Sequence, residues 1–263
     1  MSTLTVDRGV TVTMPDGVRL AADVYRPAGP GRHPVVLLRT PYDRGNAAAF
    51  GLQLNAVALA SAGYVAVIQD VRGRFGSEGS FDPFTGEAAD GVRTIEWAAE
   101  QPWSDGRLAL YGGSYGGYLV LCGLVEEPSM WQAGVDLFGD SEIAESYRHG
   151  DRSGRLDLLR MMGSPDDPAR AEGYRRGSPV YRAERIEAPL LILHGRKDKR
   201  VVPLMTERMV EALEIEGKHH EVHWYDEEGH GWEKRENRRD AFGRIVAFLK
   251  KHVLDETEPE AGP

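Results

Sequence analysis

The chain has 263 residues, of which 41% are hydrophobic and 28% charged, and its formal net charge is −9. This length suits one large domain whose core can be buried without disulfides or a structural metal. The acidic balance argues against a nucleic-acid partner, because phosphate binding needs clustered Lys and Arg. A single cysteine, Cys122, excludes an intramolecular disulfide and favours a reducing compartment.

Targeting signals are not evident in the sequence. The N-terminus lacks the basic start and apolar run of a signal peptide. The longest uncharged stretch, residues 45–69, is interrupted by glycines and polar side chains, unlike a membrane helix. We therefore expect a cytoplasmic protein that binds no membrane.

The first predicted element is a hairpin over residues 9–26, with alternating apolar residues and a turn at Pro15-Asp16-Gly17. Continuous apolar runs then indicate strands buried on both faces of a parallel sheet. These strands are residues 35–38, 65–68, 108–111, 133–137 (interrupted by Asp136), 190–193 and 220–225. Helix-length segments alternate with them at 47–62, 86–101, 115–125 and 204–216, followed by a last helix at about 237–253. The pattern predicts an α/β fold with a doubly wound, mostly parallel sheet of eight strands.

Residues 139–188 interrupt this alternation. The interval is rich in Arg, Asp, Ser and Gly, with short helical pieces at 143–149 and 155–162. Such a long excursion in a compact domain is usually functional, so we interpret it as a cap over the site. We expect one domain over residues 1–254, with this cap inserted, and a disordered acidic tail at 255–263.

The segment Gly112-Gly113-Ser114-Tyr115-Gly116 matches G-x-S-x-G between a predicted strand and a predicted helix. In the α/β-hydrolase fold this sharp turn exposes a nucleophilic serine, and glycines on either side tolerate the strained backbone. The dipole of the following helix favours negative charge developing at Ser114. We predict Ser114 as the nucleophile, and Cys122 on the same helix as a core residue.

The serine needs a base and an acid, which follow it along the chain in this fold. Asp198 comes after the predicted strand 190–193, and His230 comes after the strand 220–225. We predict that these two residues complete a catalytic triad. A rival group of histidines, His219, His220 and His223, could suggest a metal, but strand alternation divides them between the two faces. We therefore expect no metal and no organic cofactor.

Two donors should form the oxyanion hole. The backbone N–H of Tyr115, directly after the nucleophile, is the first. Tyr42, in the loop after strand 35–38, could supply its phenolic O–H as the second. The alternative is that Tyr42 only packs at a turn and that a backbone N–H is the second donor.

The first half of the chain resembles the cocaine esterase and X-prolyl dipeptidyl peptidase group. The resemblance lies in Met14-Pro15-Asp16-Gly17-Val18-Arg19-Leu20, Arg39-Thr40-Pro41-Tyr42-Asp43, Gln69-Asp70-Val71-Arg72-Gly73-Arg74, Gly76-Ser77-Glu78-Gly79 and Trp103-Ser104-Asp105-Gly106. It implies that the hydroxyl of Tyr42 is an oxyanion donor. We expect the loop at residues 70–78 to be structural, with Arg72 holding neighbouring carbonyl groups or Asp70.

The second half resembles the catalytic domain of the prolyl oligopeptidase family. The matching segments are Gly113-Ser114-Tyr115-Gly116-Gly117-Tyr118, Ser178-Pro179-Val180, Ile186-Glu187-Ala188-Pro189, Leu193-His194-Gly195 with Asp198, and Gly229-His230-Gly231. Members of the two groups carry a larger helical insertion, a jelly-roll domain or a β-propeller. We expect none of these in this chain, so their substrate specificities are not transferred to it.

The function that fits best is a serine carboxylesterase acting on small or medium acyl esters. A serine peptidase or amidase is the first alternative, and a non-catalytic binding protein on the same fold is the second. Three acids, Asp140, Glu142 and Glu145, follow a strand beside the predicted site and could receive a substrate ammonium there. The favoured alternative is that they solvate the start of a cap helix, where negative charge suits the dipole, because exposed acids are common and buried ones are costly. The expected partner is a small ester or a short peptide, and a homo-oligomer is compatible with the sequence.

Overall fold

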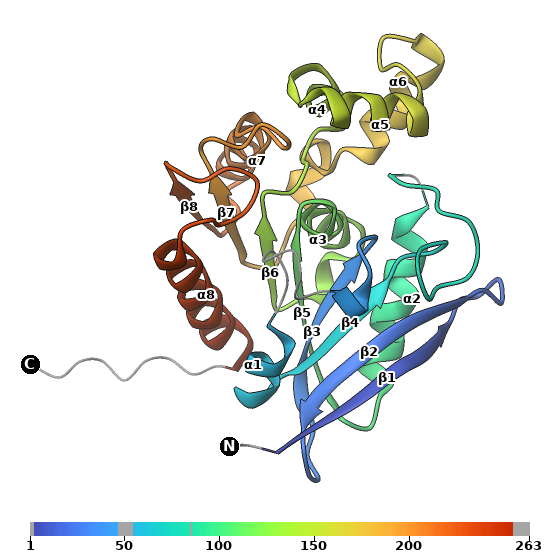
Figure 1. Cartoon of the computed structure of the whole chain (residues 1–263), viewed down its shortest axis with the longest axis vertical. Helices are drawn as coiled ribbons and strands as arrows, with labels where there is room; N and C mark the ends of the chain where they lie inside the picture. The colour runs from blue at the N-terminus through green and yellow to red at the C-terminus, as the bar shows by residue number, and fades with distance from the viewer. Residues whose placement is uncertain (1–2, 47–54, 85, 255–263) are drawn as a thin grey trace, which may run out of the picture.

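An eight-stranded, mostly parallel sheet forms the centre of the structure, a computed structural model that describes residues 3–46, 55–84 and 86–254. The strands are β1 (Leu4–Thr13), β2 (Arg19–Pro27), β3 (His33–Thr40), β4 (Val65–Asp70), β5 (Ser104–Gly113), β6 (Ala133–Leu137), β7 (Leu190–Gly195) and β8 (His220–Tyr225). Their order is β1-β2-β4-β3-β5-β6-β7-β8 (Figure 1). The pairs β1·β2 and β2·β4 are antiparallel, and the remaining pairs are parallel. The predicted fold class is confirmed.

The central strands divide their apolar side chains between two cores. On β3, Val35 and Leu37 belong to one buried cluster, whereas Val36 and Leu38 belong to the other. Successive side chains of a strand point to opposite faces of the sheet. A continuous apolar run is therefore what a strand between two helix layers requires.

One face of the sheet is covered by α2 (Glu87–Glu100), α3 (Tyr115–Glu126) and α7 (Leu204–Ile215). The opposite face is covered by α1 (Ala56–Ser61) and α8 (Arg235–Leu249). Short 3-10 turns lie at η1 (Arg44–Asn46) and η2 (Pro128–Met130). Within the described ranges, no helix is long and apolar enough to cross a lipid bilayer.

Two predicted segments extend into residues that the structure does not describe, and the last helix differs from its prediction at both ends. Of the helix expected at 47–62, the structure describes only α1, because residues 47–54 lie outside its described part. The last helix begins at Arg235, and its final turn, η4 (Lys250–Leu254), is a π-helix. The tail at 255–263 lies outside the described residues, so its disorder stays a prediction.

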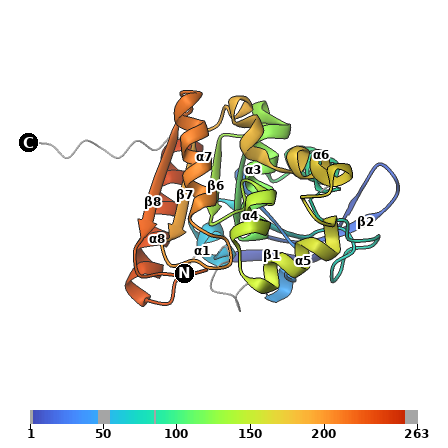
Figure 2. The ribbon, with the colours of Figure 1, turned by 90° about the horizontal axis from the view of Figure 1, so that it is seen from above.

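The interval at residues 139–188 contains α4 (Ile143–His149), α5 (Arg152–Met162), α6 (Pro168–Gly177) and the 3-10 segment η3 (Pro179–Arg185). The first three helices lie together beyond the ends of the central strands (Figure 1, Figure 2). The two helical pieces expected here are present as α4 and α5. The sequence did not indicate α6, because Tyr174 is its only large buried side chain and it has no apolar stripe. The cap function of the interval stays a prediction.

Candidate active site

Ser114 occupies a tight turn between the last residue of β5 and the first of α3. Its backbone has φ +56° and ψ −121°, a left-handed conformation that is strained for a residue with a side chain. Two backbone hydrogen bonds hold it there: Ser114 N donates to Leu137 O at 2.9 Å, and Tyr118 N donates to Ser114 O at 3.0 Å. The hydroxyl group is thereby directed to the carboxyl edge of the sheet.

Glycine is needed at Gly112 and at Gly117, and only Gly112 belongs to the G-x-S-x-G pattern. A Cβ atom on Gly112 would lie 2.2 Å from Gly116 O, and one on Gly117 would lie 2.2 Å from Asp136 Oδ1. A Cβ on Gly116 would meet its nearest atoms at 3.4 Å, which is close to ordinary contact. The close approach of α3 to β5 and β6 therefore depends on Gly112 and Gly117.

Ser114, His230 and Asp198 form a continuous hydrogen-bonded relay. His230 Nε2 lies 2.9 Å from Ser114 Oγ, and His230 Nδ1 lies 2.7 Å from Asp198 Oδ2. An ionised carboxylate only accepts, so Nδ1 carries the proton and Nε2 can accept from the serine hydroxyl. The structure thus brings together the three residues that the sequence predicted from three separate loops.

Four groups surround the Asp198 carboxylate. Oδ1 accepts from Arg200 N at 2.8 Å and from Val201 N at 3.0 Å, and Oδ2 lies 3.3 Å from His194 Nε2 as well as near His230. Burial alone would raise the pKa of Asp198, but the hydrogen bonds of His194 and His230 outweigh it and lower the pKa to about 2. Asp198 is therefore a fixed anion at any pH near neutrality.

His194 is a residue that the sequence reasoning did not use. Its Nε2 faces Val201 O at 2.9 Å in addition to Asp198, and its Nδ1 lies 2.8 Å from Thr206 Oγ1. Both oxygens beside Nε2 are acceptors, so Nε2 carries the proton and Nδ1 accepts from the threonine hydroxyl. The sequence signal was available, because His194 ends the strand that precedes Asp198, but a strand end alone does not indicate a contact.

Of the two predicted oxyanion donors, one is the side-chain hydroxyl of Tyr42 and the other is the backbone N–H of Tyr115. Tyr42 OH is 3.2 Å from Ser114 Oγ and, with the serine proton directed to His230, is the donor of that pair. Tyr115 begins α3, so its backbone N–H has no acceptor within the helix. The hydroxyl of Tyr115 points elsewhere, accepting from Phe84 N at 3.0 Å and lying 3.3 Å from Glu87 Oε1.

A cavity of about 440 Å³ opens beside Ser114. Its wall consists of Pro41, Tyr42, Arg74, Phe81, Phe84, Ser114, Tyr115, Asp140, Ser146, Gly154, Asp157, Leu158, Met161, Arg200 and Val201. The side chains on one part of the wall are apolar, and charged groups stand among the others. Such a volume accommodates a small organic ligand.

Of the three acids predicted near the pocket, only Asp140 lines this cavity. Glu142 instead bonds Tyr181 and Arg208, and Glu145 bonds Arg148 and lies 3.2 Å from His149. The prediction is wrong for Glu142 and Glu145. The physical reason is that Glu142 pairs with Arg208 of α7 and Glu145 pairs with Arg148 of α4, and neither acid lines the cavity.

Asp140 has an unusual environment. Its Oδ1 is buried without a hydrogen-bond partner among the described residues. Burial raises the pKa of Asp140, and the negative charge of Asp198 adds to this, against a hydrogen bond with Ser146. Asp140 therefore holds its proton more readily than an exposed aspartate does.

The loop at residues 70–78 is held by ion pairs, although not by the pair expected. Arg72 bonds Asp90 at 2.6 Å and Asp16 at 2.7 Å, whereas Asp70 bonds Arg44 and Gly76 N. The expected contact of Arg72 with neighbouring carbonyl groups or with Asp70 is wrong, because the Arg72 side chain bonds Asp90 of α2 and Asp16 of the β1–β2 turn.

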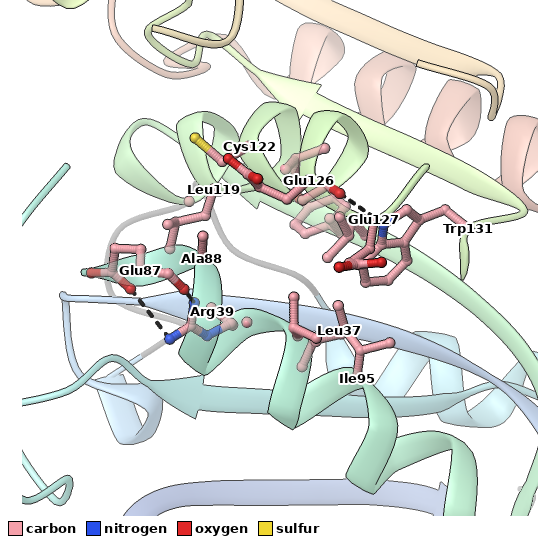
Figure 3. A pocket seen from close by; sticks show the side chains of 17 residues that line it. Leu37, Arg39, Glu87, Ala88, Ile95, Leu119, Cys122, Glu126, Glu127 and Trp131 are labelled. Atoms are coloured by element: carbon pink, nitrogen blue, oxygen red, sulfur yellow. Dashed lines mark hydrogen bonds and ion pairs between the residues drawn. The ribbon is translucent and has the colours of Figure 1, made fainter. Parts of the chain in front are cut away.

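A second cavity, of about 30 Å³, lies between α2 and α3, apart from Ser114 (Figure 3). Arg39 and Glu87 form an ion pair at its edge, with Nη2 and Oε2 3.2 Å apart. Cys122 also lines it, and burial raises the pKa of this thiol to about 12. Cys122 is a core residue, as predicted, and its thiol is inert near neutral pH.

One cluster among the described residues has the spacing of a metal site: His219, Glu221 and His252, whose ligand atoms lie within 4.8 Å of one another. His219 directly precedes β8 and Glu221 lies within it, two positions further along, whereas the sequence comparison considered only the histidines. Glu221 already lies 3.2 Å from Lys251. The cluster lies at the start of β8, whereas the relay lies beyond the ends of the strands, so it contributes nothing to the chemistry of Ser114.

The sheet order, the strained serine between β5 and α3, and the relay behind it define an α/β-hydrolase. Two solved structures share the fold: Pyrococcus horikoshii acylaminoacyl peptidase, with a TM-score of 0.81 at 23% identity, and puromycin hydrolase, with 0.81 at 21%. They match 98% and 99% of this chain, which covers 43% and 40% of theirs. The chain belongs to the X-Pro dipeptidyl-peptidase (S15) family, whose model matches residues 16–162.

Its curated relatives carry the names of esterases and peptidases. Cocaine esterase of Rhodococcus is 42% identical over 56% of this chain, and dipeptidyl aminopeptidase BIII of Pseudoxanthomonas mexicana is 31% identical over 76%. The chain spans only 24% and 31% of these two proteins. The uncharacterized peptidase YtmA of Bacillus subtilis is 28% identical over 85% of this chain and 86% of its own length. The resemblance of both halves is confirmed, and the family is one of hydrolases.

Proposed function

We propose that this protein is a serine carboxylesterase that cleaves small or medium acyl esters through an acyl-enzyme intermediate. The observation that carries the proposal is the relay from Asp198 through His230 to Ser114, with contacts of 2.7 Å and 2.9 Å. A serine hydroxyl is a weak nucleophile until a neighbouring base removes its proton. This relay supplies that base in the orientation that the reaction needs.

The reaction proceeds in two halves. Ser114 Oγ attacks the ester carbonyl while His230 Nε2 takes the serine proton, and the imidazolium then passes this proton to the departing alkoxide. Water next attacks the acyl-enzyme, with His230 again taking and returning one proton, and the carboxylic acid leaves. Asp198 keeps the proton on Nδ1 and stabilises the imidazolium in both halves.

The negative oxygen of each tetrahedral intermediate needs donors that are already in place. The N–H of Tyr115 and the O–H of Tyr42 are the groups we assign to it. The contact of 3.2 Å between Tyr42 OH and Ser114 Oγ supports this assignment. The negative charge develops on the carbonyl oxygen, which is bonded to the carbon that Oγ attacks. Prearranged donors cost no reorganisation during the reaction.

A peptidase or amidase is the second candidate. It is favoured by the peptidase names among the relatives, and by Asp140, whose carboxyl lines the cavity and could receive the ammonium of an N-terminal residue. Ester cleavage remains the primary proposal, because an alkoxide departs more easily than an amine. A binding protein on the same fold would have no need of all three relay residues. The cytoplasmic location stays a prediction.

The experiment that tests the proposal compares p-nitrophenyl esters of rising acyl length with aminoacyl p-nitroanilides, in wild type and in Ser114→Ala. We expect turnover of the esters, dependent on Ser114. Turnover confined to the anilides would establish the peptidase, and no Ser114-dependent turnover of either series would contradict both enzymatic functions.

A further inference from the structure

The cavity beside Ser114 contains two arginines whose surroundings differ. The positive charge of Arg200 is paired with two carboxylates, because its Nη1 lies 3.1 Å from Asp151 and its Nη2 lies 3.3 Å from Asp157. Arg74 has no carboxylate within ion-pair distance among the described residues. Its Nε donates to Pro41 O at 3.1 Å, and its guanidinium lies 5.2 Å from the ring centre of Phe75.

The arrangement of Arg74 leaves its two terminal nitrogen atoms available. A guanidinium has five N–H donors, and the contact with Pro41 uses only the one on Nε. Phe75 and Phe81 lie near the guanidinium at 5.2 Å and 5.3 Å, so the rings provide cation–π contacts but accept no conventional hydrogen bond. The Nη atoms have no protein acceptor among the described residues, and the side chain lines the cavity.

Neither acid of the cavity wall pairs with Arg74 among the described residues. Asp157 is already bonded to Arg200. Asp140 also lines the cavity, but no ion pair joins it to Arg74 among the described residues. Although the whole chain has a net charge of −9, the Nη atoms of Arg74 have no carboxylate partner among the described residues. An anionic group of a ligand in this cavity can therefore pair directly with Arg74.

The position of Arg74 relates this charge to the reacting ester. The carbonyl that its Nε binds belongs to Pro41, the neighbour of Tyr42, whose hydroxyl contacts Ser114. Arg74 and Ser114 line the same cavity, so one ligand can contact both residues. The apolar side chains of Phe81, Phe84 and Met161 line the same cavity and suit a short hydrocarbon spacer.

We propose that Arg74 forms a carboxylate-binding subsite and that the preferred substrates are esters carrying a free carboxylate remote from the scissile bond. This inference rests on the proposed esterase function and names its substrate class. A guanidinium can bind a carboxylate through two parallel hydrogen bonds, which gives both affinity and orientation. Arg74 would act in binding and not in the chemical step.

The test measures a selectivity ratio: kcat/KM for a charged ester divided by kcat/KM for its neutral counterpart. On the acyl side, mono-p-nitrophenyl glutarate is compared with p-nitrophenyl valerate. On the alcohol side, 4-(butyryloxy)benzoate is compared with its methyl ester. The two arms show which half of the substrate carries the carboxylate. A general loss of activity in a variant lowers both kcat/KM values by the same factor, so it cancels in the ratio.

In wild type we expect the charged ester to be preferred about tenfold or more in one arm, as a charge-assisted contact provides. Arg74→Met should bring that ratio close to the intrinsic ratio of the two esters with hydroxide, and Arg74→Lys should keep part of the preference. The matched control is Arg175→Met, which removes one exposed cation of α6 that does not line the cavity. It should keep the wild-type ratio.

Three results would overturn the subsite: no preference in either arm, a wild-type ratio in Arg74→Met, or a higher kcat/KM for a free α-amino ester than for both charged esters. The last result would assign the pocket to Asp140 and an ammonium group. Failure of the subsite is distinguishable from failure of the esterase, because Ser114-dependent turnover of the neutral esters tests the latter alone.

Discussion

Asp198 Oδ2 accepts from two histidines at once, with His230 Nδ1 at 2.7 Å and His194 Nε2 at 3.3 Å. The second histidine is fully buried and fixed at its other nitrogen by Thr206, so it limits how the carboxylate can turn. Since Asp198 orients His230, the geometry at Ser114 depends on His194, although His194 does not contact Ser114. His194 is a positioning residue.

His194→Gln should lower kcat by about tenfold to a hundredfold with a smaller change in KM, because a displaced acid misorients the base. The effect should disappear in the background of Asp198→Asn, where there is no carboxylate left to position. Kinetics of the two single variants and the double variant measure this coupling. Additive losses in the double variant would mean that His194 only stabilises the fold.

Tyr42→Phe removes a hydroxyl that lies 3.2 Å from Ser114 Oγ. We expect kcat to fall by about 10²–10³ with little change in KM, because an oxyanion donor acts mainly in the transition state. Tyr181→Phe is the matched control, since that hydroxyl bonds Glu142 away from the cavity. Nearly full activity in Tyr42→Phe would make Tyr42 a packing residue, and a backbone N–H would then be the second donor.

Asp136 makes the stability of the protein depend on pH. It is a buried strand residue, and burial raises its pKa to about 7 from the ordinary value of 3.8, against a hydrogen bond from Gly139 N. The folded protein therefore holds an extra proton between these two values, so the free energy of unfolding falls as pH rises from about 4 to about 7. Each pKa unit is worth about 1.4 kcal/mol.

Asp136→Asn removes this titration while its amide oxygen can still accept from Gly139 N. We expect the variant to gain more stability relative to wild type at pH 8 than at pH 4.5. Urea unfolding at both pH values measures the difference, with Asp226→Asn as a control for the loss of an exposed charge. An equal effect of Asp136→Asn at the two pH values would contradict the raised pKa.

The turn that carries Ser114 gives a prediction about its glycines. Gly112→Ala would place a Cβ atom 2.2 Å from a backbone oxygen, whereas Gly116→Ala would meet its nearest atoms at 3.4 Å. Gly112→Ala should therefore lower the free energy of unfolding by about 1–3 kcal/mol or more, as overpacked sites do. The urea midpoint of Gly116→Ala should stay close to wild type, and equal losses in both variants would contradict this account.

The sequence predicted the sheet well because each central strand has a recognisable local pattern. Runs such as residues 35–38 are apolar at every position, which only a strand between two helix layers requires. It predicted the relay residues because the fold fixes which loop follows which strand. Helix α6 was missed, since its helical pattern carries no apolar stripe.

The rest of the site depends on contacts that no local pattern encodes. Glu142 and Glu145 turned out to bond cations around α4, and the partner of Glu142 on α7, Arg208, is distant in the sequence. Arg74 lies in a loop for which the sequence predicted only a structural role. Its position in the cavity wall follows from its contacts with Pro41 and Phe81. Such partners become visible only when distant segments are brought together in space.

The most direct test of the central claim is the site of covalent modification by a fluorophosphonate, read by mass spectrometry of the intact protein and its peptides. The account predicts one adduct per chain, located on Ser114, absent in Ser114→Ala and formed much more slowly in His230→Ala. A folded protein that forms no adduct, or an adduct on another residue that persists in Ser114→Ala, would contradict it.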